Sequence, residues 1–140
     1  MPFSSRSFNI TPNIAKQLLA DALVCRELEI CGLLSCDNER QYSYPISNIA
    51  ATPATHFEMD PKQLIYAFKK IRELKQTLLA IYHSHPDGGI EPSATDIKQH
   101  QYHNLLYLII SHGNGVLNLG GYVINEDQTV ERVTLTALKH

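Results

Sequence analysis

The sequence has few cysteines and no long apolar run, and both features limit the cellular compartments in which we expect the protein. Its three cysteines, Cys25, Cys31 and Cys36, form neither an even set nor a Cys-x-x-Cys pair, so we expect a reducing compartment and no disulfide framework. No segment has the roughly 20 consecutive apolar residues of a membrane-spanning helix. Residues 1–9 lack the basic start and apolar stretch of a secretory signal. We therefore expect a soluble, cytoplasmic protein with no membrane partner.

An excess of basic charge is also missing. The 12 Lys and Arg residues against 14 Asp and Glu residues give a net charge of -2, so there is no surplus of cations to neutralise phosphates and a nucleic-acid partner is disfavoured. Gly88-Gly89 has neither the lysine nor the glycine spacing of a phosphate loop and predicts a turn. The length of 140 residues and the ordinary composition, 44% apolar and 19% charged, predict a single domain over 1–140.

Hydrophobic periodicity predicts both helices and strands. Thr11-Pro12 and Asp60-Pro61 each begin a segment with apolar residues at helical spacing. Short aliphatic runs between polar turns indicate strands. The expected helices are 11–26, 60–75 and 93–102, the expected strands are 29–35, 41–49, 78–82, 105–110, 117–124 and an edge strand at 130–135, and the expected turns are 36–40, 113–115 and 125–128. This order predicts an α/β (α+β) fold with a mixed central sheet flanked by helices.

The segment from His83 to Asp96 joins the end of an expected strand to the start of a helix and holds the candidate site. His83 and His85 are two residues apart, so on a strand they point to the same face. Seven residues separate His85 from Ser93, and the turn that follows can bring the Asp96 carboxylate to the imidazoles. Two imidazoles and a carboxylate suit one zinc ion. Three protein ligands leave the fourth tetrahedral position open, which is typical of catalytic sites.

Hydrolysis of an amide by zinc-bound water also needs a carboxylate that moves protons. Glu91 lies in the loop after His85, and Glu27 and Glu29 lie far upstream. Spacing does not choose between these three residues.

Simpler explanations exist for parts of this segment. Ser93-x-x-Asp96 is a helix-capping pattern, which is compatible with a ligand role for Asp96. A His-x-His pair is weak evidence by itself, because such pairs often make only local hydrogen bonds. Cys31 lies in the apolar run 30–34, which favours a buried thiol over a nucleophile. The remaining histidines have no informative spacing and are expected to be surface or structural residues: His56, His100, His103, His112 and His140.

Two distant motifs resemble those of a known family. The string His83-x-His85-Pro86, continued to Pro92 and followed by Ser93-x-x-Asp96, resembles the signature of the JAMM (MPN-plus) metallopeptidases. Upstream, the stretch from Glu29 to Leu34, Glu-Ile-Cys-Gly-Leu-Leu, is similar to the family strand that carries the catalytic glutamate. Asn48 and Phe57-Glu58-Met59-Asp60-Pro61 resemble the small bacterial, Mec-like branch. The resemblance thus spans most of the chain.

The resemblance implies a JAMM/MPN fold and a role for each matching residue. His83, His85 and Asp96 would bind zinc, with water as the fourth ligand. Glu29 would take a proton from this water and later deliver one to the departing amine, and Ser93 would hydrogen-bond the oxyanion. The Mec-like branch further implies a peptidase or isopeptidase that cuts the amide bond after the C-terminal Gly-Gly tail of a ubiquitin-like sulfur-carrier protein.

Other functions remain alternatives. A non-catalytic MPN-type module would bind a ubiquitin-like carrier without cutting it, and a deubiquitinase-like isopeptidase would act on ubiquitin itself. A zinc nucleoside deaminase has a compatible layout, but its Pro-Cys-x-x-Cys string is absent. The helical zinc-protease string His-Glu-x-x-His is also absent. Incubation with a diglycine-tailed carrier fusion separates a peptidase from a binding module.

Overall fold

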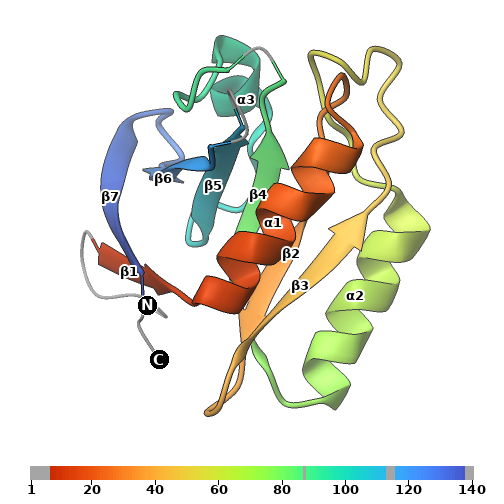
Figure 1. The fold of residues 1–140 in the computed structure, drawn as a ribbon, viewed down its shortest axis with the longest axis vertical. Coiled ribbons are helices and arrows are strands. Elements are labelled where there is room, and N and C mark those ends of the chain that lie inside the picture. Colours follow the sequence, from red (N-terminus) through yellow and green to blue (C-terminus); the bar gives the residue numbers. More distant parts are fainter. Residues whose placement is uncertain (1–6, 87, 113–115, 138–140) are drawn as a thin grey trace.

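The computed structural model describes residues 7–86, 88–112 and 116–137. In these residues seven strands form one sheet in the order β1-β7-β6-β5-β4-β2-β3. The pairs β4–β5 and β1–β7 are parallel and the others are antiparallel, which confirms the predicted mixed sheet. The elements are β1 (Ser7–Ile10), α1 (Pro12–Val24), β2 (Cys31–Cys36), β3 (Gln41–Ile46), α2 (Pro61–Glu73), β4 (Thr77–Ser84), α3 (Ala94–Gln99), β5 (Leu106–Ser111), β6 (Asn118–Ile124) and β7 (Val130–Ala137) (Figure 1).

Helices cover both faces of the sheet because each strand alternates apolar side chains between its two sides. On one face, Leu18 of α1 packs in a cluster with Tyr82 of β4. On the other face, Ile71 of α2 packs with Ile81 of β4, and Ile97 of α3 borders the same cluster. Figure 1 shows α1 and α2 along the sheet and the short α3 at one end. Since side chains two apart on β4 share a face, His83 lies with Ile81 on the side of α2 and α3.

The strand β1 was not predicted, and the prediction that 130–135 is an edge strand is wrong. Ser7–Ile10 pairs in parallel with Thr134–Ala137, so β1 and β3 are the outer strands. A four-residue segment carries little periodicity of its own, and its partner lies more than a hundred residues away. The expected turn at 113–115 lies outside the described residues.

The third helix is shorter than its predicted range of 93–102. It ends at Gln99, and His100 adopts an extended backbone with φ -66° and ψ 133°. The Tyr102 carbonyl then accepts hydrogen bonds from the His100 side chain at 2.8 Å and from the Leu105 amide at 3.1 Å. These tertiary contacts turn the chain into β5, which helix periodicity alone does not show.

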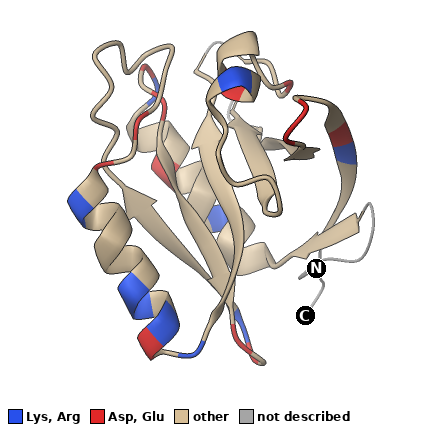
Figure 2. Ribbon diagram, turned by 180° about the vertical axis from the view of Figure 1, so that it is seen from behind, with Lys and Arg blue, Asp and Glu red and all other residues tan. Residues whose placement is uncertain are grey.

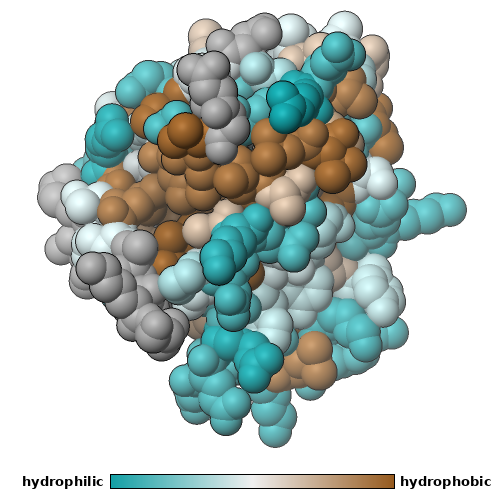
Figure 3. Space-filling model, viewed as in Figure 1, coloured by the Kyte–Doolittle hydropathy of each residue, from teal (hydrophilic) through white to brown (hydrophobic). Residues whose placement is uncertain are grey.

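The two long helices present different outer surfaces. Hydrophobic side chains gather in a band across the face on which α1 lies (Figure 3), and Val24 at its end is 83% exposed. The outer side of α2 carries charged residues together with exposed Ile65 and Tyr66. Among the described residues, no helix is long and apolar enough to span a bilayer.

Candidate metal centre

The candidate ligands come from two elements that the sheet brings together. His83 is the next-to-last residue of β4 and is fully buried. His85 follows the end of β4, where its amide still donates to the Ile110 carbonyl of β5 at 2.9 Å. Asp96 lies in the first turn of α3, which begins after the N-cap residue Ser93. As the sequence predicts, these three residues lie close together at one end of the sheet.

Three ligand-type atoms form a compact triangle. His83 Nε2 lies 3.0 Å from His85 Nε2 and 3.3 Å from Asp96 Oδ2, and His85 Nε2 lies 3.1 Å from the same oxygen. Tetrahedral zinc with bonds of about 2.0–2.1 Å has ligand atoms about 3.3 Å apart. The triangle therefore has the size that a single zinc ion needs, and these residues could hold a metal.

Outer hydrogen bonds orient two of the three side chains. His85 Nδ1 donates to the Gly89 carbonyl at 2.8 Å, and in the neutral imidazole this leaves the Nε2 lone pair toward the triangle. Ser93 and Asp96 form a capping box: the Ser93 amide donates to Asp96 Oδ2 at 2.9 Å, and the Asp96 amide donates to Ser93 Oγ at 3.0 Å. The predicted helix cap is therefore present, and the same box positions the carboxylate.

Burial and hydrogen bonds shift the pKa values of the three candidate ligands, and for His83 and Asp96 the shifts favour the form that binds a cation. Burial lowers the pKa of His83 and keeps its imidazole neutral. Although burial opposes ionisation of Asp96, hydrogen bonds from His83 and His85 hold its pKa well below its usual range. For His85, hydrogen bonds to Asp96 and to the Gly89 carbonyl outweigh burial and raise the pKa. A buried carboxylate thus faces two imidazole nitrogens.

Glu29 is the acidic residue that the fold brings to this centre. Its side chain is 5% exposed, and Oε1 lies 3.9 Å from His83 Nε2. Among the described residues this buried oxygen has no hydrogen-bond partner. Burial raises the pKa of the Glu29 carboxyl to about 7, an effect that His85 partly offsets and Asp96 reinforces. Such a carboxyl exchanges its proton near neutral pH, as a general base or acid requires.

The other two carboxylates considered from the sequence are elsewhere. Glu27 is exposed, and Glu91 is 71% exposed with its carboxylate 3.6 Å from Arg132. Backbone contacts explain why Glu29 differs: its amide donates to the Pro53 carbonyl at 2.8 Å, and Asn48 Nδ2 donates to its carbonyl at 3.0 Å. Of these three carboxylates, Glu29 is the one that the structure places beside the triangle.

Two aromatic residues that periodicity did not single out frame His83. Phe57 stacks on its imidazole with ring centroids 4.4 Å apart, and Tyr107 lies at 5.1 Å. Burial raises the pKa of the Tyr107 hydroxyl, and the charge of Asp96 and a hydrogen bond with it add to the effect. Tyr107 is the one aromatic residue in the aliphatic stretch Leu105–Ile110, and that contrast is the signal that could have identified it.

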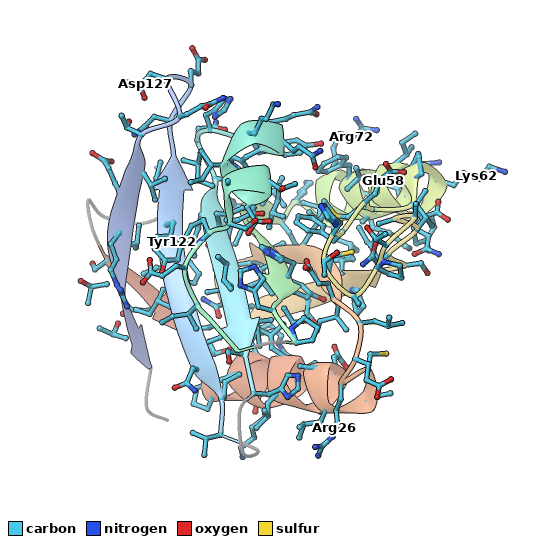
Figure 4. All side chains as sticks on the ribbon, turned by 90° about the horizontal axis from the view of Figure 1, so that it is seen from above. Arg26, Glu58, Lys62, Arg72, Tyr122 and Asp127 are labelled. Atoms are coloured by element: carbon cyan, nitrogen blue, oxygen red, sulfur yellow. The ribbon has the colours of Figure 1, made fainter. Side chains whose placement is uncertain are left out.

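The loop between the ligands is tied to the sheet. The Tyr122 hydroxyl donates to the Ile90 carbonyl at 2.7 Å, and Ser111 Oγ donates to the Gly88 carbonyl at 2.8 Å. Tyr122 lies on β6 beneath this loop (Figure 4). At Gly120 a Cβ would lie 2.6 Å from the Ile90 carbonyl oxygen, so only glycine permits the close approach.

A cavity of about 520 Å³ opens beside the centre. Asp96, Tyr107, residues 56–59 and Leu64 are among the residues that line it. Its mixed apolar and polar lining has the character of a site that receives a ligand group.

The family model described as prokaryotic homologs of the JAB domain matches residues 11–129. The chain belongs to this family. This membership confirms the resemblance to the prokaryotic branch of the JAMM family.

Two curated relatives have names that describe an activity. The chain is 34% identical over 86 residues, 59% of its length, to a desampylase from Haloferax volcanii, and the match spans 62% of that protein. It is also 34% identical over 104 residues, 74% of its length, to a probable TtuB-protein conjugate cleaving protease from Thermus thermophilus, of which it covers 67%. The chain thus spans about two thirds of the length of these relatives.

Solved structures confirm the fold. A protein from Desulfitobacterium hafniense aligns with a TM-score of 0.80 and 30% identity, covering 94% of this chain and 93% of that one. A JAB1/MPN domain protein from Archaeoglobus fulgidus aligns with a TM-score of 0.55 and 16% identity, covering 97% of this chain and all of the other. The predicted JAMM/MPN fold is therefore correct.

Proposed function

We propose that this protein is a zinc-dependent peptidase or isopeptidase that cuts the amide bond after the C-terminal Gly-Gly tail of a small ubiquitin-like sulfur-carrier protein. The observation that carries the proposal is the Glu29 carboxyl, buried 3.9 Å from a nitrogen of the His83, His85 and Asp96 triangle. The names of the two relatives, a desampylase and a protease that cleaves TtuB conjugates, support a substrate in which a small modifier protein is joined to another group.

The residues present fit a zinc ion. His83, His85 and Asp96 would hold it through the three atoms whose separations match a tetrahedral site. The unpartnered Glu29 Oε1 lies 3.9 Å from one of them, His83 Nε2. When bound, zinc supplies a Lewis acid that polarises a carbonyl and lowers the pKa of water.

Glu29 and Ser93 then have separate tasks. A carboxyl with a pKa of about 7 can take up a proton at Oε1 and release it to a departing amine within one turnover. Ser93 Oγ accepts a hydrogen bond from the Asp96 amide. The hydrogen of its hydroxyl group therefore remains available to donate to an oxyanion. Ser93 is exposed at the start of α3, where a substrate carbonyl can reach it.

The decisive experiment combines metal analysis with cleavage. A diglycine-tailed carrier fused through an amide to a second protein is incubated with wild type, Glu29→Gln and the exposed control Glu39→Gln, and products are read by intact mass. We expect about one zinc per chain in all three proteins, cleavage by wild type and Glu39→Gln, and none by Glu29→Gln.

The result also separates the competing functions. Full activity in Glu29→Gln would rule out its assignment as the base. Binding of the carrier without cleavage by wild type would identify a binding module instead.

A further inference from the structure

Basic charge is concentrated on α2. Between Lys62 and Lys75 there are five basic residues and one acidic residue, a net charge of +4 in a chain whose total is -2. The rest of the sequence therefore carries -6. Figure 2 shows several Lys and Arg positions along this helix. The acidic residue of the segment is Glu73. A local excess of one sign favours a partner of the opposite sign.

The exposed side of α2 combines cations with large apolar side chains. At 100° per residue, Lys62, Ile65, Tyr66, Lys69 and Arg72 share one side of the helix. Ile65 is 67% exposed and Tyr66 is 61% exposed. In Figure 4, Lys62 extends from α2 away from the rest of the molecule. Apolar and aromatic anchors among charged residues are typical of protein-binding surfaces.

Stability of the helix does not account for this composition. Cations in the last turn, such as Arg72, interact favourably with the helix dipole, but Lys62 lies in the first turn, where a positive charge is unfavourable. Tyr66 lines a second groove with Tyr44 and Pro45 of the outer strand β3. The cation at Lys62 and the exposed ring of Tyr66 therefore require an explanation other than helix stability.

The helix that carries the basic face also borders the cavity beside Asp96. Leu64, on the inner side of α2, lines the cavity beside Asp96, and Phe57, just before the helix, stacks on His83. At 1.5 Å per residue, the helix carries the chain only about 12 Å from Leu64 to Arg72. A folded domain whose tail enters the cavity would lie over this helix.

We propose that the exposed face of α2 (Lys62, Ile65, Tyr66, Lys69 and Arg72) binds an acidic surface on the folded body of the carrier protein whose tail is cut. This inference rests on the proposed function, because the tail places the body beside α2. The exposed aliphatic side chain of Ile65 favours a protein surface over a nucleic acid, because it can neither neutralise a phosphate nor stack on a base as an aromatic ring does.

The test compares whole-protein and peptide substrates. Each diglycine-ended ubiquitin-like protein of the source organism is joined at its C-terminus to a fluorogenic amine, beside a peptide of its last eight residues. The variants are the double charge reversal Lys62→Glu/Lys69→Glu and the control Lys16→Glu/Arg40→Glu, which changes net charge equally at exposed sites on other elements. We expect the first to raise KM for the whole carrier about tenfold, with kcat and peptide cleavage unchanged.

Several outcomes would overturn the proposal. One is an unchanged KM for the whole carrier in Lys62→Glu/Lys69→Glu, and another is an equal rise in the control. If wild type cleaves neither substrate, the proposed function fails, and the same carriers are titrated into isotope-labelled protein. Chemical-shift changes on α2 would then still support the docking face, whereas their absence would refute it.

Discussion

Replacing Glu29 by Gln should change the pH dependence of stability in the metal-free protein. Burial raises the pKa of Glu29 to about 7 from the ordinary value of 4.5. Below pH 4.5 the carboxyl is protonated in both folded and unfolded chains. Above that pH it ionises first in the unfolded chain, so the stability it contributes at low pH is lost as the pH rises through 7. Each pH unit corresponds to about 1.4 kcal/mol, and the full loss is about 3 kcal/mol.

Glutamine cannot ionise and therefore does not show this loss. When the pH rises from 4 to 8.5, we expect the free energy of unfolding of Glu29→Gln to increase by about 3 kcal/mol relative to that of wild type. Urea denaturation in the presence of a chelator measures the free energy of unfolding at both pH values, and Glu39→Gln, at an exposed position, serves as the control. A difference between wild type and Glu29→Gln that does not vary with pH would refute a buried Glu29 carboxyl with a raised pKa.

Four further changes test the site. Asp96→Asn should keep a side-chain oxygen for the hydrogen bond from the Ser93 amide but lose the charge that His83 and His85 stabilise, so the protein should be destabilised by about 2 kcal/mol in urea denaturation while zinc affinity, measured by chelator competition, falls by at least about a hundredfold. Ser93→Ala should cost about 1 kcal/mol through the lost cap and lower kcat by about a hundredfold, whereas Ser93→Thr should retain both functions in the same assays. Tyr122→Phe should lose the hydrogen bond to the Ile90 carbonyl and destabilise the protein by about 1 kcal/mol in urea denaturation. Removal of metal with a chelator should abolish cleavage, and added zinc should restore it and raise the Tm.

Strong local signals made most of the fold predictable. The pairs Thr11-Pro12 and Asp60-Pro61 cap the two long helices as expected, because a side-chain oxygen and a following proline act within one helical turn. The segment β1 gave no such signal, since Ser7–Ile10 becomes a strand only by pairing with β7. Missing that pair led directly to the wrong expectation of an edge strand at 130–135.

The candidate site divides in a similar way. The grouping of His83, His85 and Asp96 is predictable because a strand end, a short loop and a helix start hold them close together in the chain. Glu29 lies more than fifty residues away, and its environment depends on Pro53 and Asn48, which hold its backbone. No periodicity predicts such contacts.

The sequence by itself determined the order of elements, the caps and the grouping of the three candidate ligands, because these depend on interactions between residues close in the chain. Only the tertiary structure decided that Glu29 is buried beside His83 while Glu27 and Glu91 are exposed. It also decided that Phe57 and Tyr107 enclose the imidazole. Burial, and with it the pKa of Glu29 near 7, arises from the packing of segments far apart in the chain.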